Sequence, residues 1–184
     1  MDSIPEVRDD ENVLVLQVAE LLVAKHLTIA TAESCTGGLL SGALTGVSGA
    51  SAFYLGGVVA YDNRVKADVL GVPQSLIDSD GAVSAAVAIE MARRGRALIG
   101  ADICIAITGI AGPLGATPGK PVGTTFIAFV SERDNHAQEF HFSGDRAGNR
   151  ASSVREALRM LIEHLQSEDT PGATPVYEAE VAAQ

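Results

Sequence analysis

The chain has 184 residues and a net charge of −10, with 13 Lys and Arg against 23 Asp and Glu. This length suits one domain with a substantial core, and the 47% apolar content, without Trp, favours helices packed on a hydrophobic sheet. The charge disfavours broad binding to nucleic acid or to an anionic membrane, because both depend on basic patches. A small anionic ligand remains compatible, since a few local cations and a helix N-terminus can hold a phosphate.

Cysteine usage and the N-terminal sequence predict a cytoplasmic protein. Cys35 and Cys104 are too few for a disulfide framework, and Cys104 lies in an apolar run that predicts a small buried hydrophobe. The acidic start lacks the basic residues of a secretory signal. We expect one domain over residues 12–166, between a flexible N-terminal segment, 1–11, and a disordered acidic tail, 167–184.

The first part of the chain predicts alternating helices and strands. The spacing of apolar residues over 12–26 suits an amphipathic helix. A strand is expected at 28–33, followed by a glycine turn and a helix that ends near Leu44. A second strand is expected at 53–61, and a short helix over 63–70 follows it.

The middle of the chain predicts a long helix and a buried strand. One or two helical turns are expected at 73–78. Ser84 is the expected N-cap of a helix that reaches Ile99 and is softly broken by Gly95. The nearly all-apolar run at 103–108 is typical of a strand buried on both faces.

The last part predicts a loop, a hairpin and a closing helix. Residues 109–122 contain several Gly and Pro and form the expected loop. Strands are expected at 123–131 and 137–142, with the hairpin turn at 134–135, and a helix at 147–166. Early strand–helix alternation followed by a hairpin indicates the α/β class, with a mixed sheet between helix layers.

The motif ESCTGG at 33–38 is the strongest functional signal. It places the Ser34 hydroxyl at the end of the first expected strand, beside backbone N–H groups at a helix start. A serine nucleophile and an oxyanion or phosphate site need those parts. The alternative is that Ser34 or Thr36 caps the helix while Gly37 and Gly38 only turn the chain.

Two further segments carry candidate chemistry at strand ends. Lys66 can act as a base if burial or cationic neighbours lower its pKa, and Ser-Lys pairs with an assisting Tyr such as Tyr61 are an established arrangement. The alternative is a solvated lysine and a sheet-end aromatic. Thr108 and Gly109 begin a glycine-containing stretch where open α/β sheets bind ligands, and a tight turn is the alternative.

Arg146 precedes or begins the last expected helix and is placed to bind a phosphate or carboxylate. The alternative is an Asp145 N-cap beside a solvated Arg146. Lys120 is either a further cation of the site or a solvated side chain. No metal site is expected: the histidines are scattered, and His136 and His141 are an odd number of residues apart, so in a strand they point to opposite faces.

Six motifs together resemble the CinA C-terminal domain family, whose enzymatic members are nicotinamide-nucleotide amidohydrolases. They follow in order with compact spacing: AESCTGG (32–38), YDNRVK (61–66), GAVS (81–84), TGIAGP (108–113), KPVGT (120–124) and FSGDR (142–146). The resemblance covers about residues 12–166. Larger members carry an additional N-terminal domain for which this chain has no room, so we expect the stand-alone form.

The resemblance implies a three-layer α/β/α sandwich with a mixed sheet and a homo-oligomer, a dimer or larger. It also implies hydrolysis of the carboxamide of nicotinamide mononucleotide to nicotinate mononucleotide and ammonia, without metal or cofactor. Ser34 matches the family's nucleophile, and Lys66 and Tyr61 match the Lys and Tyr of the second motif. The chain departs from the family at Asp62 and Thr108, where Ser is common; both keep a polar group.

The mechanism expected from this match is acyl transfer to Ser34, with neutral Lys66 as the base. The expected oxyanion and substrate contacts are the remaining site residues: Cys35, Thr36, Gly37, Gly38, Thr108, Gly109 and, for the phosphate, Arg146. Cys35 is the second candidate for the nucleophile; no His lies near it in the sequence. The alternative for the whole chain is a non-catalytic nucleotide-binding module of the same fold, which need not keep a Ser-Lys-Tyr set.

Overall fold

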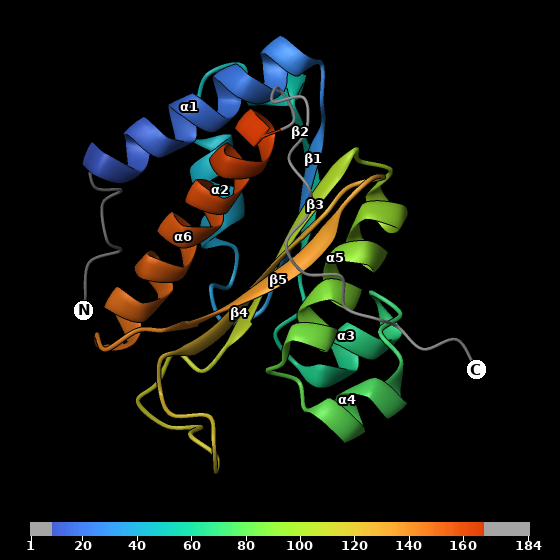
Figure 1. Ribbon diagram of the computed structural model, residues 1–184, viewed down its shortest axis with the longest axis vertical. Coiled ribbons are helices and arrows are strands. Elements are labelled where there is room, and N and C mark those ends of the chain that lie inside the picture. Colours follow the sequence, from blue (N-terminus) through green and yellow to red (C-terminus); the bar gives the residue numbers. More distant parts are fainter. Residues whose placement is uncertain (1–8, 168–184) are drawn as a thin grey trace.

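The computed structural model describes residues 9–167, which form one five-stranded sheet with helices on both faces (Figure 1). The strand order is β2-β1-β3-β4-β5. The first three strands are parallel, and the last two run antiparallel to their neighbours, so the expected mixed sheet is confirmed. The strands are β1 (Ile29–Glu33), β2 (Tyr54–Val59), β3 (Ile103–Gly109), β4 (Thr124–Val130) and β5 (Asn135–His141).

Two helix layers cover the sheet, which confirms the three-layer α/β/α class (Figure 1). One layer holds α1 (Asp9–Lys25), α2 (Leu39–Thr45) and α6 (Arg146–Ser167). The other holds α3 (Asn63–Asp68), α4 (Gln74–Asp80) and α5 (Ala85–Ile99), and the short 3-10 turn η1 (Ala50–Ala52) precedes β2. None of the helices within residues 9–167 combines the length and apolarity needed to cross a membrane.

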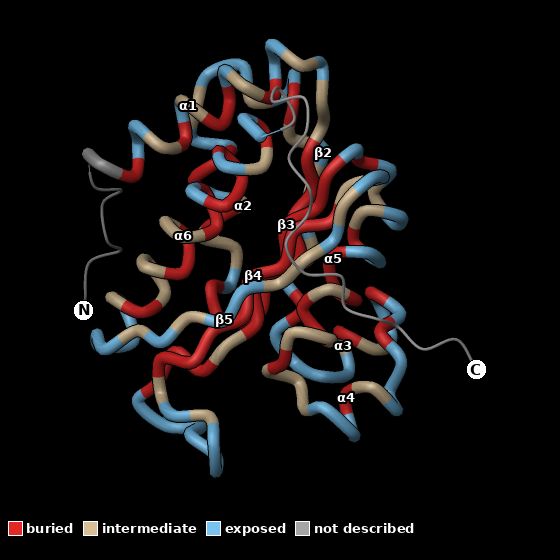
Figure 2. The backbone as a smooth tube through the Cα atoms, in the orientation of Figure 1, coloured by how far each residue is buried: buried red, intermediate tan, exposed pale blue. Residues whose placement is uncertain are grey.

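Strand β3 shows how the sequence builds two cores. Ile103, Ile105 and Ile107 pack in the core beneath α1, α2 and α6, whereas Cys104 and Ala106 face α5. Alternate side chains of a strand point to opposite faces, so an all-apolar strand fits only at the centre of a covered sheet. Figure 2 shows this buried band along β1, β3 and β4.

Helix α5 is continuous, so the expected break at Gly95 is wrong. A Cβ at Gly95 would lie 3.0 Å from Cys104 Sγ and 3.4 Å from the Ala32 Cβ. The glycine therefore serves close packing of the helix on small sheet residues rather than a bend. The expected N-cap is confirmed, because Ser84 Oγ accepts the Val87 N–H at 3.3 Å.

Two other boundaries differ from the expected ones. Helix α1 begins at Asp9, so residues 9–11 of the expected N-terminal segment are helical. The hairpin loop covers 131–134, closed by a Ser131 N–H···O=C Asp134 bond of 2.8 Å, and Asn135 already pairs with Val130 in the ladder. The tail expected to be disordered lies, from residue 168 on, outside the described residues.

Candidate active site

The central feature is a hydrogen bond between two buried side chains that are 32 residues apart in the sequence. Ser34 follows β1 directly, and Lys66 lies in α3, on the segment that leaves the neighbouring strand β2. Their Nζ–Oγ distance is 3.0 Å, and Lys66 is only 2% exposed. The alternative of a solvated surface lysine is therefore wrong.

The surroundings of Lys66 ease the loss of a proton from its ammonium group. Burial lowers the pKa of Lys66 below its ordinary value of 10.5, and the charges of Cys35 and Asp62 oppose that effect. Nζ also donates to the backbone carbonyls of Ala60 at 2.9 Å and Tyr61 at 3.3 Å. In the ammonium form, its three N–H groups donate to Ser34 Oγ and to these two carbonyls. After loss of one proton, the carbonyls can hold the two remaining N–H groups, and the lone pair then faces Ser34 Oγ.

The Cys35 thiol is a poor competitor for the role of nucleophile. It is buried, and this burial raises its pKa to about 11. A thiol with this pKa is almost entirely protonated at neutral pH, and the thiolate is the reactive form. The hydroxyl of Ser34 is the stronger candidate, because Lys66 lies within hydrogen-bond distance to accept its proton.

The turn after Ser34 is held by Glu33, a residue to which the sequence analysis gave no role. Its fully buried carboxylate accepts the backbone N–H groups of Gly38, Leu40 and Ser41 at 3.0, 3.1 and 2.8 Å, and the Ser41 hydroxyl at 2.6 Å. A carboxylate there satisfies the orphan donors and the dipole of the α2 N-terminus. The alternative that Ser34 or Thr36 caps this helix is therefore wrong. The only sequence signal for Glu33 is an acid that ends an apolar strand.

Some backbone N–H groups of this turn already donate a hydrogen bond within the protein, and others do not. The Gly38 amide is committed to Glu33, and the Gly37 amide donates to the Ser34 carbonyl at 3.0 Å. Within residues 9–167, the Cys35 and Thr36 amides donate to no other residue. Thr36 is fully buried, whereas Cys35 lines the cavity described next, so the Cys35 amide is the one of this pair placed to bind an anion.

A cavity of about 240 Å³ opens beside the Ser34–Lys66 pair. Seven residues expected in the site line it: Ser34, Cys35, Tyr61, Lys66, Thr108, Gly109 and Arg146. Thr36, Gly37 and Gly38 do not. The apolar part of the wall, which includes Val83, Ile110 and Leu114, was not predicted, because isolated apolar residues carry no spacing signal in the sequence.

Arg146 joins three segments at the rim of this cavity. Its guanidinium donates to the Gly112 carbonyl at 2.8 Å and to the Tyr61 hydroxyl at 2.9 Å, so it is not simply solvated. The Asp145 carboxylate accepts the Gly148 N–H at 2.7 Å and so occupies the N-terminus of α6. Lys120 lies outside the cavity lining and donates to the Asp80 carbonyl at 3.0 Å.

Arg150, one helical turn after Arg146, was also missed, although an i, i+4 arginine pair at a helix start is a usable signal. Its guanidinium donates to the Thr36 carbonyl at 2.6 Å and thereby braces the turn that follows Ser34. Arg146 and Arg150 both line a neighbouring open hollow of about 610 Å³. Two cations therefore line the hollow next to the cavity.

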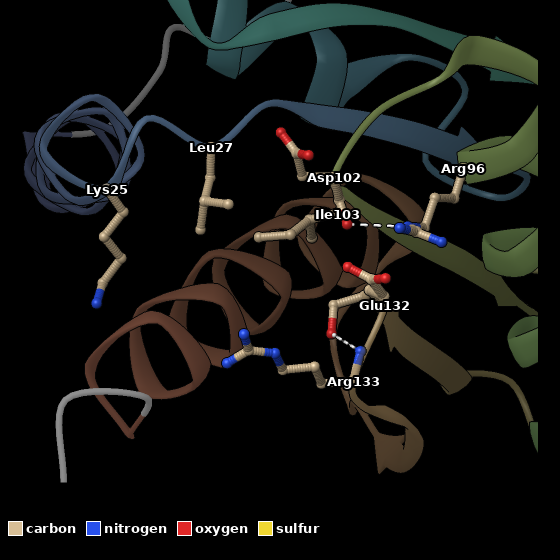
Figure 3. A pocket seen from close by; sticks show the side chains of 8 residues that line it. Lys25, Leu27, Arg96, Asp102, Ile103, Glu132 and Arg133 are labelled. Atoms are coloured by element: carbon tan, nitrogen blue, oxygen red, sulfur yellow. Dashed lines mark hydrogen bonds between the residues drawn. The ribbon is translucent and has the colours of Figure 1, made fainter.

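A larger pocket, of about 350 Å³, lies at the opposite end of the parallel strands, where β1 and β3 begin, and contains none of the expected site residues (Figure 3). Its charged wall is mixed: Lys25, Arg96 and Arg133 against Asp102 and Glu132. Hydrogen bonds from Thr28 hold the pKa of Asp102 below its usual value, so that this carboxylate is ionised and already bound. The pocket lacks a nucleophile–base pair, and the cavity beside Ser34 is the stronger candidate.

Comparison with known proteins gives a consistent result at the sequence level. The family model for the CinA C-terminal domain matches residues 11–165. A CinA-like protein from Geobacter metallireducens is 45% identical over 161 residues, which cover 88% of this chain and 39% of that protein. A putative competence-damage inducible protein from Desulforudis audaxviator is 45% identical over 83% of this chain and 37% of its own length. The chain thus spans less than half of these relatives.

Solved structures share the fold over nearly their whole length. Competence damage-inducible protein A from Klebsiella pneumoniae superposes with a TM-score of 0.83 at 39% identity, covering 85% of this chain and 97% of that chain. The competence/damage inducible protein CihA from Agrobacterium tumefaciens gives a TM-score of 0.83 at 37% identity, covering 90% and 99%.

Proposed function

The chain belongs to the CinA C-terminal domain family, and from that premise we propose that it is a nicotinamide-nucleotide amidohydrolase. It converts nicotinamide mononucleotide to nicotinate mononucleotide and ammonia through a Ser-Lys mechanism that uses no metal. The observation that carries the proposal is the 3.0 Å hydrogen bond between Ser34 Oγ and the buried Lys66 amine.

Acylation uses this pair directly. Neutral Lys66 accepts the hydroxyl proton while Ser34 Oγ forms a bond to the carboxamide carbon, and the carbonyl electrons move onto oxygen. When this tetrahedral intermediate collapses, the C–N bond breaks and the nitrogen takes the proton from the Lys66 ammonium. Ammonia leaves, and the nicotinoyl group remains as an ester on Ser34.

Deacylation repeats the same steps with water. Lys66 removes a proton from the water, whose oxygen attacks the ester carbon, and collapse returns the proton to Ser34 Oγ. The carboxylic acid is released and loses its proton to solvent. Assistance from the Tyr61 hydroxyl in either proton transfer remains a prediction, and its bond to Arg146 places that hydroxyl at the rim of the cavity.

The oxyanion of both intermediates needs hydrogen-bond donors. In the turn after Ser34, the Cys35 amide is the candidate donor, because Cys35 lines the cavity and its amide donates to no other described residue. Arg150 braces the same turn through the Thr36 carbonyl. Loss of one such donor typically raises the barrier by about 3 kcal/mol.

The cavity has a polar end and an apolar end that suit the two parts of the substrate. Val83, Ile110 and Leu114 provide an apolar wall for a pyridine ring. Arg146 is assigned to the 5′-phosphate, because its guanidinium faces the rim and matches phosphate in geometry and charge. The helix N-terminus itself is less suited to the phosphate than expected, since Asp145 already occupies it.

The decisive measurement is ammonia release from nicotinamide mononucleotide, in the presence of EDTA, by the wild type, Ser34→Ala and Lys66→Ala. Ser75→Ala and Lys120→Ala are the matched controls, because both residues lie outside the cavity lining. We expect turnover in the wild type and controls and a collapse in both site variants. Activity that survives Ser34→Ala would implicate Cys35, and tight substrate binding without wild-type turnover would indicate the non-catalytic module.

A further inference from the structure

Three potential metal ligands gather at the edge of the sheet remote from Ser34. Asp134 ends the β4–β5 loop, His136 lies in β5, and His164 lies near the end of α6. His164 follows Arg146 by 18 residues of one helix, which is about 27 Å at the usual rise. The histidines that the sequence analysis treated as scattered are therefore, in this pair, neighbours. We propose that Asp134, His136 and His164 bind a divalent transition-metal ion of the Zn²⁺ type.

The tautomer of His164 is the first observation behind this proposal. Its Nδ1 lies 2.9 Å from the Met160 carbonyl, which can only accept, so Nδ1 carries the hydrogen. The lone pair of Nε2 is then left facing Asp134 Oδ2, 3.2 Å away. Two acceptors at this separation repel each other unless a cation, either a proton or a metal ion, lies between them. A carbonyl that orients a histidine in this way is also the usual outer support of a metal ligand.

The spacing of the ligand atoms is the second observation. His136 Nδ1 lies 3.7 Å from the same Asp134 oxygen, and the three ligand atoms all lie within 4.8 Å of one another. In a tetrahedral zinc site with bonds of about 2.0–2.1 Å, neighbouring ligand atoms are ~3.3 Å apart. The two distances from Asp134 Oδ2 to the histidine nitrogens, 3.2 and 3.7 Å, are thus near the ligand–ligand distance of a tetrahedral site.

The orientation of the two rings also matters for coordination. His136 Nδ1 and His164 Nε2 both lie near the same Asp134 oxygen, at 3.7 and 3.2 Å. The rings of His136 and His164 stack with centroids 4.1 Å apart and an interplanar angle of 18°. Because a lone pair lies in the plane of its ring, binding one ion requires the His136 ring to turn out of this stack.

The three side chains are half-buried, with 40%, 25% and 21% of Asp134, His136 and His164 exposed. Solvent can therefore complete the coordination as a fourth ligand. The ion would fasten the hairpin loop and β5 to the end of α6, and the net charge of the occupied site is one positive. Its role is structural, and it is separate from the chemistry at Ser34.

The test is isothermal titration of the full-length, tag-free, chelator-stripped protein with Zn²⁺, and with Co²⁺ as a spectroscopic probe. We expect one ion per chain and the intense visible absorption of tetrahedral Co²⁺. His164→Ala, His136→Ala and Asp134→Asn should each weaken binding by about tenfold or more. His141→Ala is the matched control, because His141 lies on the other face of β5, where its contacts are with Glu139 and Thr124.

Thermal melting gives a second readout that does not depend on activity. Zn²⁺ should raise the Tm of the wild type and of His141→Ala by mass action, and should not raise that of His164→Ala. The proposal is overturned if the wild type does not bind either metal ion, or if binding and the Tm shift persist unchanged in His136→Ala and His164→Ala. In either case the cation between Asp134 and His164 is a proton.

Discussion

Lys66 is the residue whose protonation state controls the proposed reaction. Burial lowers its pKa, so a larger fraction is neutral at a given pH than for an exposed lysine. Only the neutral amine accepts the Ser34 proton, so kcat/KM should rise with pH and level off once the pH exceeds the pKa of Lys66. Because this pKa is lowered, the plateau should begin at a lower pH than for an ordinary lysine with a pKa of 10.5. A pH–rate profile checks this, and a profile that falls through the same range would contradict it.

Lys66→Arg separates positive charge from basicity at this position. Guanidinium keeps its proton throughout the accessible pH range and cannot act as the base. We expect activity to fall by about 10²–10⁴-fold at every pH, the usual contribution of a positioned base. Circular dichroism should show a folded variant, and substantial activity in it would exclude Lys66 as the base.

Glu33 has a structural role that a conservative substitution can isolate. Glu33→Gln keeps the size of the side chain but removes its charge and puts an N–H₂ group among the amides of Gly38, Leu40 and Ser41. We expect a loss of about 1–3 kcal/mol in the free energy of unfolding, the cost of unsatisfied buried donors. Urea unfolding measures it, with the exposed Glu132→Gln as the control. Equal stability of the two variants would show that the amides do not depend on the carboxylate.

At the scale of elements, Gly95 tests why α5 is straight and close to the sheet. Gly95→Ala gains up to about 1 kcal/mol of helix propensity but places a Cβ 3.0 Å from Cys104 Sγ. We expect overpacking to prevail and to cost about 1–3 kcal/mol. Gly42→Ala in α2 is the matched control, because its Cβ would meet nothing within 4 Å and it should stabilise. Chemical denaturation measures the free energy of unfolding of both variants, and stabilisation by Gly95→Ala would refute the packing argument.

Helix α5 also illustrates which features of the fold could be predicted from the sequence and which could not. Apolar periodicity and turn residues were sufficient for the order of helices and strands, because those signals are local. Gly95 was misjudged because a mid-helix glycine has the same local signature whether it breaks a helix or admits a neighbour. The Ser34–Lys66 pair was anticipated from its motifs, while Glu33 and Arg150 act through contacts that depend on the tertiary fold.

At the scale of the whole molecule, Arg146 connects the two helix layers across the cavity. It extends from α6 to Tyr61, which leads into α3 of the opposite layer. Arg146→Ala should raise KM for nicotinamide mononucleotide by about tenfold or more, the loss of a charge-assisted phosphate contact. The effect should be small for nicotinamide riboside, which lacks the phosphate. Arg159→Ala, an exposed arginine of the same helix, is the control, and an equal effect on both substrates would contradict the assignment.

The Tyr61–Arg146 contact joins residues 85 positions apart and includes the first residue of α6. Synthesis proceeds from the N-terminus, and domains fold as units as they emerge. A nascent chain that has exposed Ser34 and Lys66 therefore contains both reactive residues but still lacks β3, β4 and α6, and with α6 the brace from Arg150. Stalled ribosome-bound chains should accordingly acquire hydrolase activity only when a C-terminal spacer carries α6 out of the exit tunnel.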